Sequence, residues 1–209
     1  MFVKKYLEYL RISWTRFTDH LLLSSLVIGL DFLTVLSISV ILSSGLGFYF
    51  KLILLYFVWS IPQVFSWHIT YRISEREEGP MLINYAKRFF VINTIWIPIL
   101  LVATLIENNI LRYLILFFVM VMTHASYVLI FKKKKAKKYV SNFTKFFYNR
   151  KGLYISLIFI ISILSYFLLD NLRLILEFSP ETMLIIGFLY TFTIIILTRL
   201  MLIISIEKN

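Results

Sequence analysis

Six lysines stand among the seven residues from Lys132 to Lys138, between two long runs of almost purely apolar sequence. Such a block of like charge cannot be packed into a core, and carrying it across a lipid bilayer is costly. If the flanking apolar runs cross a membrane, the block fixes the side on which both of them end. The other segments can then be assigned outward from this point.

The composition is typical of a membrane protein. Hydrophobic residues make up 60% of the chain, aromatic residues 18% and charged residues 16%, which is far too apolar for an ordinary soluble domain. The net charge of +11 comes from lysines and arginines beside apolar runs, so an anionic membrane surface explains it better than nucleic acid does. The chain has no cysteine, which excludes disulfides, thiolate metal sites and a cysteine nucleophile.

Apolar runs of about 20 residues are long enough to cross a bilayer as helices. We expect an all-α integral membrane protein, with six transmembrane helices arranged as three hairpins in a single domain over residues 1–209. Ser43 to Gly47 predicts the turn of the first hairpin, and Ser179 to Glu181 predicts the N-terminal cap and first turn of the last helix. The expected spans are residues 21–44, 48–70, 89–105, 111–131, 153–169 and 182–206.

Residues 1–18 predict an amphipathic helix that lies in the membrane interface instead of crossing the membrane. Lys4, Glu8 and Arg11 share one face of this helix. Apolar residues at helical spacing form the other face: Val3, Tyr6, Leu7, Leu10, Trp14 and Phe17. A similar interfacial helix is expected within a basic cytoplasmic loop at residues 132–152.

The connections between the expected spans divide sharply in charge. Eighteen lysines and arginines fall on the side of the lysine block, and three, Lys51, Arg112 and Arg173, fall on the other side. Because cytoplasmic loops carry the excess of lysine and arginine, we expect a protein of the cytoplasmic membrane whose N- and C-termini both lie in the cytoplasm.

An aromatic and a basic residue precede each of the three spans expected to enter from the cytoplasm. They occur in the segments Trp14 to Phe17, Tyr85 to Arg88 and Phe143 to Phe146. One interpretation is a threefold repeat of an interfacial helix followed by a hairpin. The other is that every such span needs a basic, aromatic collar at the lipid headgroups.

The chain has an amphipathic start, a first hairpin with a glycine turn, then Glu77, Glu78 and Gly79 before an aromatic and basic helix that reaches Asn93, and later a basic loop. In this order of features it resembles the YesL-like family of small bacterial membrane proteins. The resemblance covers most of the chain in layout and short patches in residues. It implies six spans and an association with carbohydrate uptake systems, and it supplies no catalytic residues.

The sequence contains no motif that names a reaction. It lacks GxSxG, HExxH, a phosphate-binding glycine loop and the paired acidic motif of lipid-headgroup transferases. We therefore expect no catalytic residues, no cofactor, no metal site and a function that is not enzymatic.

Charged residues inside a span are costly, so they should face protein or water and not lipid. Counting from the cytoplasmic ends of the spans places five polar residues in the inner half of the bundle: Asp31, Gln63, Asn93, His124 and Arg199. We expect Asp31 and Arg199 to point inward and to pair, directly or through His124 or water. Three interpretations stay open: these residues hold the spans together, Arg199 extends to the inner lipid headgroups instead, or the residues form an anion or proton site open to the cytoplasm.

Two hypotheses of function follow. The favoured one is a non-enzymatic accessory or scaffold subunit that engages anionic lipids and a partner complex, either another membrane protein or a second copy of the chain, and no nucleic acid. The contact is expected at the lysine block: Lys132, Lys133, Lys134, Lys135, Lys137 and Lys138. The alternative is a small transporter or substrate-binding membrane subunit with a solute site in the inner half of the bundle.

Overall fold

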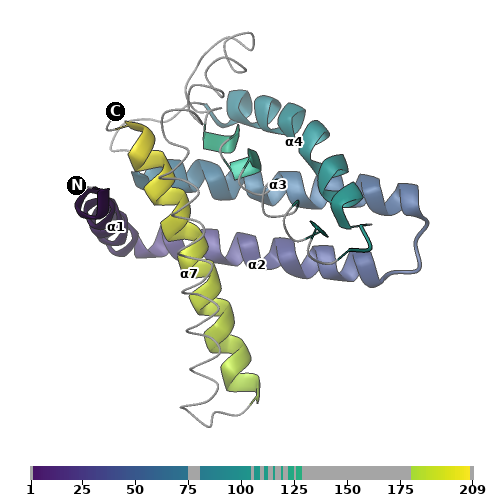
Figure 1. The fold of residues 1–209 in the computed structure, drawn as a ribbon, viewed down its shortest axis with the longest axis horizontal. Coiled ribbons are helices and arrows are strands. Elements are labelled where there is room, and N and C mark those ends of the chain that lie inside the picture. Colours follow the sequence, from purple (N-terminus) through teal and green to yellow (C-terminus); the bar gives the residue numbers. More distant parts are fainter. Residues whose placement is uncertain are drawn as a thin grey trace.

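The computed structural model describes residues 2–74, 81–104, 106–108, 111–112, 115, 119, 122–124, 126–128 and 180–207. All regular structure in these residues is α-helical, as expected, and they include no strand. The helices are α1 (Phe2–Asp19), α2 (Leu21–Ser43), α3 (Phe48–Ser74), α4 (Leu82–Thr104) and α7 (Pro180–Glu207) (Figure 1). The basic loop at 132–152 and the expected span at 153–169 lie outside the described residues, and the expected span at 111–131 is described only at separate helical residues.

A sharp break separates α1 from α2. His20, between the two helices, has φ −119° and ψ 44°, which lies outside the helical range. The Phe17 carbonyl at the end of α1 accepts a hydrogen bond of 3.1 Å from the Ser24 hydroxyl, so a side chain of α2 satisfies it. The helix expected at residues 1–18 is therefore a separate element and does not continue into α2.

The helices α2 and α3 form an antiparallel hairpin, and side chains cap its turn. Ser44 Oγ donates to the Ile41 carbonyl at 2.6 Å, and Lys51 Nζ donates to the Leu42 carbonyl at 3.0 Å. These bonds satisfy carbonyls that the end of α2 would otherwise leave unpaired. This turn does not require glycine, because neither Gly45 nor Gly47 has a φ in the left-handed range and a Cβ on either would meet no atom within 4 Å.

In the described part of the chain, α2 and α3 are long and apolar enough to cross a membrane. α2 has 23 residues and closely matches the expected span at 21–44. α3 has 27 residues and continues through Pro62 to Ser74, beyond the expected end at residue 70. Residues 189–204 of α7 form a shorter apolar helical stretch.

The fourth helix begins earlier than the expected span at residues 89–105. α4 starts at Leu82 because no proline or glycine separates its polar first turns from the apolar part, so the two form one continuous helix. It runs antiparallel to α3. The Tyr56 hydroxyl lies 3.2 Å from Thr94 Oγ1, and the rings of His68 and Tyr85 lie 6.3 Å apart.

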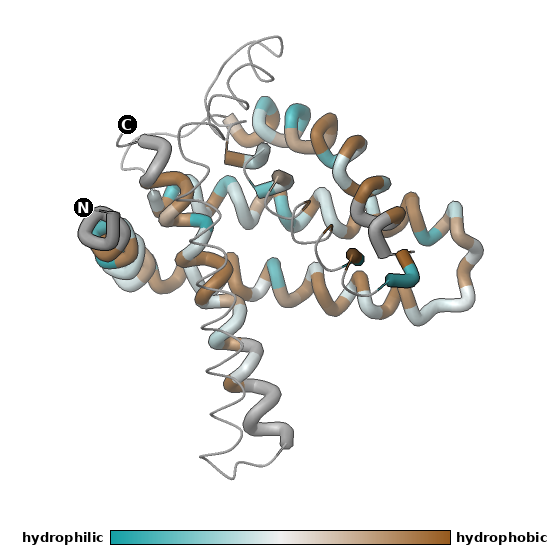
Figure 2. The backbone as a smooth tube through the Cα atoms, viewed as in Figure 1, coloured by the Kyte–Doolittle hydropathy of each residue, from teal (hydrophilic) through white to brown (hydrophobic). Residues whose placement is uncertain are grey.

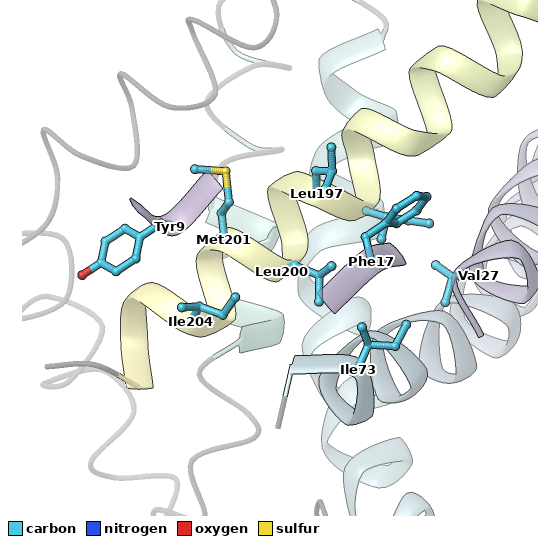
Figure 3. Close-up of a cluster of buried hydrophobic side chains, with 9 residues drawn as sticks. Tyr9, Phe17, Val27, Ile73, Leu197, Leu200, Met201 and Ile204 are labelled. Carbon is cyan, nitrogen blue, oxygen red and sulfur yellow. The ribbon is translucent and has the colours of Figure 1, made fainter. Parts of the chain in front are cut away.

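The C-terminal helix α7 crosses α2 and α3 instead of running alongside them (Figure 1). It starts at Pro180, in agreement with the predicted N-terminal signal. Its C-terminal half is the buried part. Figure 3 shows the packing there of α7 residues Leu197, Leu200, Met201 and Ile204 with Tyr9 and Phe17 of α1, Val27 of α2 and Ile73 of α3.

Burial in the α2–α3 hairpin is inverted relative to a water-soluble domain. The inward side chains of these helices include many small or polar residues, namely Ser24, Asp31, Thr34, Ser60, Gln63, Ser66 and Thr70. The outward side chains are large and apolar, and we call the following set the exposed apolar band: Leu22, Leu26, Leu33, Leu36, Val40, Ile53, Phe57 and Ile61. Figure 2 shows hydrophobic residues along most of α2 and a mixture of hydrophobic and more polar residues along α3.

Candidate functional site

Asp31 lies on the inward face of α2 and is 3% exposed. Ser24, Val27 and Thr34 are buried on the same face of the helix, at separations of three, four and seven residues that a helical stripe requires. This stripe faces α3 and α7, the helices that contact α2 along its inner side. The fold therefore places a carboxylate in a region from which water is excluded.

Arg199 of α7 pairs directly with Asp31. Its Nη1 atom lies 2.9 Å from Asp31 Oδ2, and both side chains are almost fully buried. Asp31 Oδ1 also accepts hydrogen bonds of 2.8 Å from Gln63 Nε2 and 2.8 Å from Ser66 Oγ. Arg199 in turn donates to Gln63 Oε1 at 3.0 Å and to the Ser66 hydroxyl. We call Asp31, Gln63, Ser66 and Arg199 the ion-pair cluster.

The Arg199 guanidinium also lies against an aromatic ring. Its Cζ atom is 4.9 Å from the centroid of the Trp67 ring, and Trp67 is 0% exposed. A desolvated cation over a tryptophan face is a favourable arrangement, worth about 2 kcal/mol. The ion-pair cluster is thus bounded on one side by the face of Trp67.

Asn93, which the sequence groups with Asp31, makes its described hydrogen bonds to other residues. Its Nδ2 atom donates to Ser60 Oγ at 2.9 Å, and its Oδ1 atom accepts a short hydrogen bond from the Tyr127 hydroxyl. Trp59 Nε1 donates to the same hydroxyl at 3.1 Å. We call Trp59, Ser60, Asn93 and Tyr127 the Asn93 network, and it joins α3 and α4 to residue 127.

Trp67 connects the two polar groups through its packing. Its ring centroid lies 5.4 Å from that of Tyr127 and 5.6 Å from that of His124, both in edge contacts. His124 and the ion pair therefore both lie next to Trp67. Asp31 and Arg199 pair directly, without His124 between them. The five residues grouped by the sequence analysis divide into a cluster of Asp31, Gln63 and Arg199, a separate network around Asn93, and His124 beside both.

The structure adds Trp59, Ser60, Ser66, Trp67 and Tyr127 to the site residues predicted from the sequence. A signal for the α3 members was present in the pattern. Polar or small residues recur along this otherwise apolar helix at three- and four-residue spacing: Ser60, Gln63, Ser66, Thr70 and Ser74, all of them buried. Such a stripe marks the inward face of an apolar helix, and it places Ser66 and its neighbour Trp67 next to Gln63.

The chemistry of the site is that of a neutral, buried ion pair with added hydrogen bonds. In the described part of the chain there is no group of three or more histidine, cysteine, aspartate or glutamate residues that could hold a metal ion. Two buried donors, Arg199 Nε and Trp67 Nε1, have no hydrogen-bond partner among the described residues. The lysine block lies outside the described residues.

The residues that the structure describes form an all-α fold in which two helices are long and apolar enough to span a membrane, and a buried ion pair joins one of them to α7. Comparison with protein-family models, with curated proteins and with solved structures gives no match.

Proposed function

We propose that this chain is a multi-pass protein of the cytoplasmic membrane, with six spans and both termini in the cytoplasm. The observation that carries the proposal is the inverted burial of the α2–α3 hairpin. Leu22, Leu33 and Val40 are 85%, 54% and 62% exposed, whereas Asp31 is 3% exposed. Such a surface suits hydrocarbon, while the polar side chains satisfy one another inside the protein.

The degree of burial favours lipid over a soluble core as the surroundings of these helices. The core helix of a soluble protein is also long and apolar, but it is mostly buried. In the most apolar 18-residue stretch of each helix, only 17% of the residues of α2 and 22% of those of α3 are buried. The division of lysine and arginine between the two sides supports the proposed orientation.

Within the membrane, we propose a non-enzymatic accessory or scaffold role. The ion-pair cluster supports it because its members bond to one another. Asp31 Oδ1 accepts from Gln63 and Ser66, and Gln63 Oε1 accepts from Arg199. Because the members of this cluster bond to one another, they join α2, α3 and α7. Few of their polar atoms are left to bind a solute.

The inner face is the proposed contact with anionic lipids and a partner complex. Arg72 at the end of α3 and Lys87 near the start of α4 are exposed, on the same side as the lysine block in the proposed topology. The resemblance to the YesL-like family supports a partner among carbohydrate uptake systems.

A small transporter or substrate-binding subunit is the second candidate, and the two buried donors favour it. Arg199 Nε and Trp67 Nε1 could each donate to an oxygen of a carboxylate or phosphate group. An anionic solute at this position would lie in the inner half of the proposed bundle, next to the ion-pair cluster.

Purification of the tagged protein in a mild detergent distinguishes the two candidates. A protein partner recovered in stoichiometric amount supports the accessory role. A small molecule that remains bound and is released on denaturation supports the transporter. Recovery of the protein from the soluble fraction without detergent would contradict the membrane proposal itself.

A pair of variants tests the inner face. Arg72→Gln combined with Lys87→Gln removes exposed charge from the proposed inner end, and Lys51→Gln removes charge from the opposite end as the control. We expect the partner to be lost from the first variant and kept by the second. Equal recovery with both would exclude these two residues from the contact.

A further inference from the structure

The N-terminal helix α1 has three sides of different character. Tyr9, Ser13 and Phe17 are buried on one side. Leu7, Leu10 and Trp14 recur at helical spacing on a second side, and all three are exposed. The polar residues Glu8, Arg11 and Thr15 form the third side. The single apolar face expected from the sequence is therefore divided, and only part of it contacts the protein.

The buried side holds the C-terminal helix. Tyr9 and Phe17 belong to one core cluster with Leu200, Met201 and Ile204 of α7 (Figure 3). These residues adjoin Arg199, the α7 member of the ion-pair cluster. Because this side is already occupied, the exposed Leu7 and Leu10 are not needed to hold α1 against the protein, whereas the half-exposed Trp14 also stacks on Phe17 with ring centroids 5.8 Å apart.

The start of α2, which follows the exposed polar residues Thr18, Asp19 and His20, is also apolar and exposed. Leu7, Leu10 and Trp14 are 58%, 38% and 51% exposed, and Leu21 and Leu22 at the start of α2 are 59% and 85% exposed. Leu22 belongs to the exposed apolar band, which faces lipid in the proposed function. Along the chain, the apolar side of α1 is thus followed by the surface of α2 that is proposed to face lipid.

The charge and width of this side favour a lipid surface over a second protein. Exposed Arg11 borders it, and Trp14 has the amphipathic ring that is enriched at membrane interfaces. The three apolar residues, Leu7 to Trp14, extend over about 10 Å of helix. A stable protein interface needs about 800 Å² from each partner, far more than three side chains supply.

We propose that the side of α1 formed by Leu7, Leu10 and Trp14 is a binding site for the surface of an anionic phospholipid bilayer. This inference rests on the proposed membrane location. Bound there, α1 lies in the headgroup region with its polar side toward water and its buried side on α7. Membrane binding by α1 and the docking of α7 then stabilise each other, because one helix makes both contacts.

The absence of cysteine allows a direct test with single labels. The full-length chain is reconstituted into vesicles of phosphatidylethanolamine and phosphatidylglycerol, with an environment-sensitive fluorophore at Leu10→Cys. Thr15→Cys on the polar side and Leu26→Cys in the exposed apolar band are the matched controls. We expect blue-shifted emission and quenching by brominated acyl chains for the labels at 10 and 26, and water-like emission for the label at 15.

Each other outcome has a defined meaning. A water-like label at position 10 with a quenched label at 26 would overturn the assignment of α1 and leave the membrane proposal standing. Water-like labels at both positions would overturn both proposals. A label at position 10 that is shielded without lipid quenching, and more so as protein is concentrated, would show a protein in place of lipid. Equal quenching in phosphatidylcholine vesicles would remove the requirement for anionic lipid.

A second variant guards against disturbance by the label. Leu7→Ser leaves the buried side of α1 and the ring contact of Trp14 with Phe17 intact, so thermal stability in detergent should be unchanged. In vesicles it should reduce the lipid quenching at position 10. Unchanged quenching would contradict a binding site at these residues.

Discussion

Removing Arg199 should destabilise the protein more than neutralising Asp31 does. Arg199→Ala leaves the buried Asp31 carboxylate with two neutral donors, Gln63 and Ser66, and breaking a buried ion pair in this way costs about 3 to 5 kcal/mol. Asp31→Asn also leaves a buried charge without its partner, but it keeps an oxygen for Gln63 and Ser66, and the guanidinium keeps Gln63 Oε1 and the face of Trp67, so we expect a loss at the lower end of that range, about 3 kcal/mol.

The neutral double variant should recover much of this loss. In Asp31→Asn with Arg199→Met no charge is buried, and replacing both charges of a buried pair is often close to neutral in stability. Thermal unfolding in detergent measures all three variants. For a chain of 209 residues each kcal/mol corresponds to about 2 to 4 °C, so Arg199→Ala should lower Tm by about 6 to 20 °C.

Thr34→Val is the matched control for the loss of a buried polar group from α2. Its hydroxyl bonds to the Leu30 carbonyl of its own helix at 2.7 Å, so this change should cost less than about 1 kcal/mol. Additive losses in the double variant would refute the reasoning, because they would mean that Asp31 and Arg199 do not interact. A double variant that folds normally but no longer retains a co-purified solute would instead support the transporter.

Two further predictions concern topology and the Asn93 network. Single cysteines at Lys135 and Asn108 should react with an impermeant reagent from opposite sides of the membrane, and labelling of both from outside intact cells would contradict the proposed orientation. Tyr127→Phe removes the hydroxyl that joins Asn93 and Trp59, so it should lower the free energy of unfolding by about 1 to 3 kcal/mol, and an unchanged unfolding midpoint would show that this network contributes little.

Hydropathy predicted the two helices of the hairpin well because each helix is a long apolar run. α2 begins where the apolar run starts after His20, and it ends at the serines and glycines that follow Leu42. A helix after Gly79 and Pro80 was expected to lead into the span at residues 89–105, and the structure joins the two as one continuous helix from Leu82. The crossing of α7 was not predictable, since hydropathy reports the length of a helix and not its angle to its neighbours.

The pairing of Asp31 with Arg199 was predictable from the free-energy cost of placing an unpaired charge in an apolar segment. A carboxylate and a guanidinium in apolar segments each need a partner of opposite charge. Asp31 and Arg199 are each other's partner. Ser66 and Trp67 were not singled out, because serine and tryptophan are common in such helices and their roles depend on which face is buried. Asn93 could not be separated from the pair by depth, since depth does not specify the direction in which a side chain points.

The ion pair joins residues that the ribosome makes at very different times. Asp31 and Arg199 are 168 residues apart, whereas Gln63 and Ser66 follow Asp31 by 32 and 35 residues. At about 5 to 20 residues per second, Arg199 appears roughly 10 to 30 s after Asp31. During this interval the amide and hydroxyl of the first hairpin are the partners already at hand for the carboxylate. We therefore expect Gln63 and Ser66 to be the partners of the Asp31 carboxylate in the nascent chain until α7 is made.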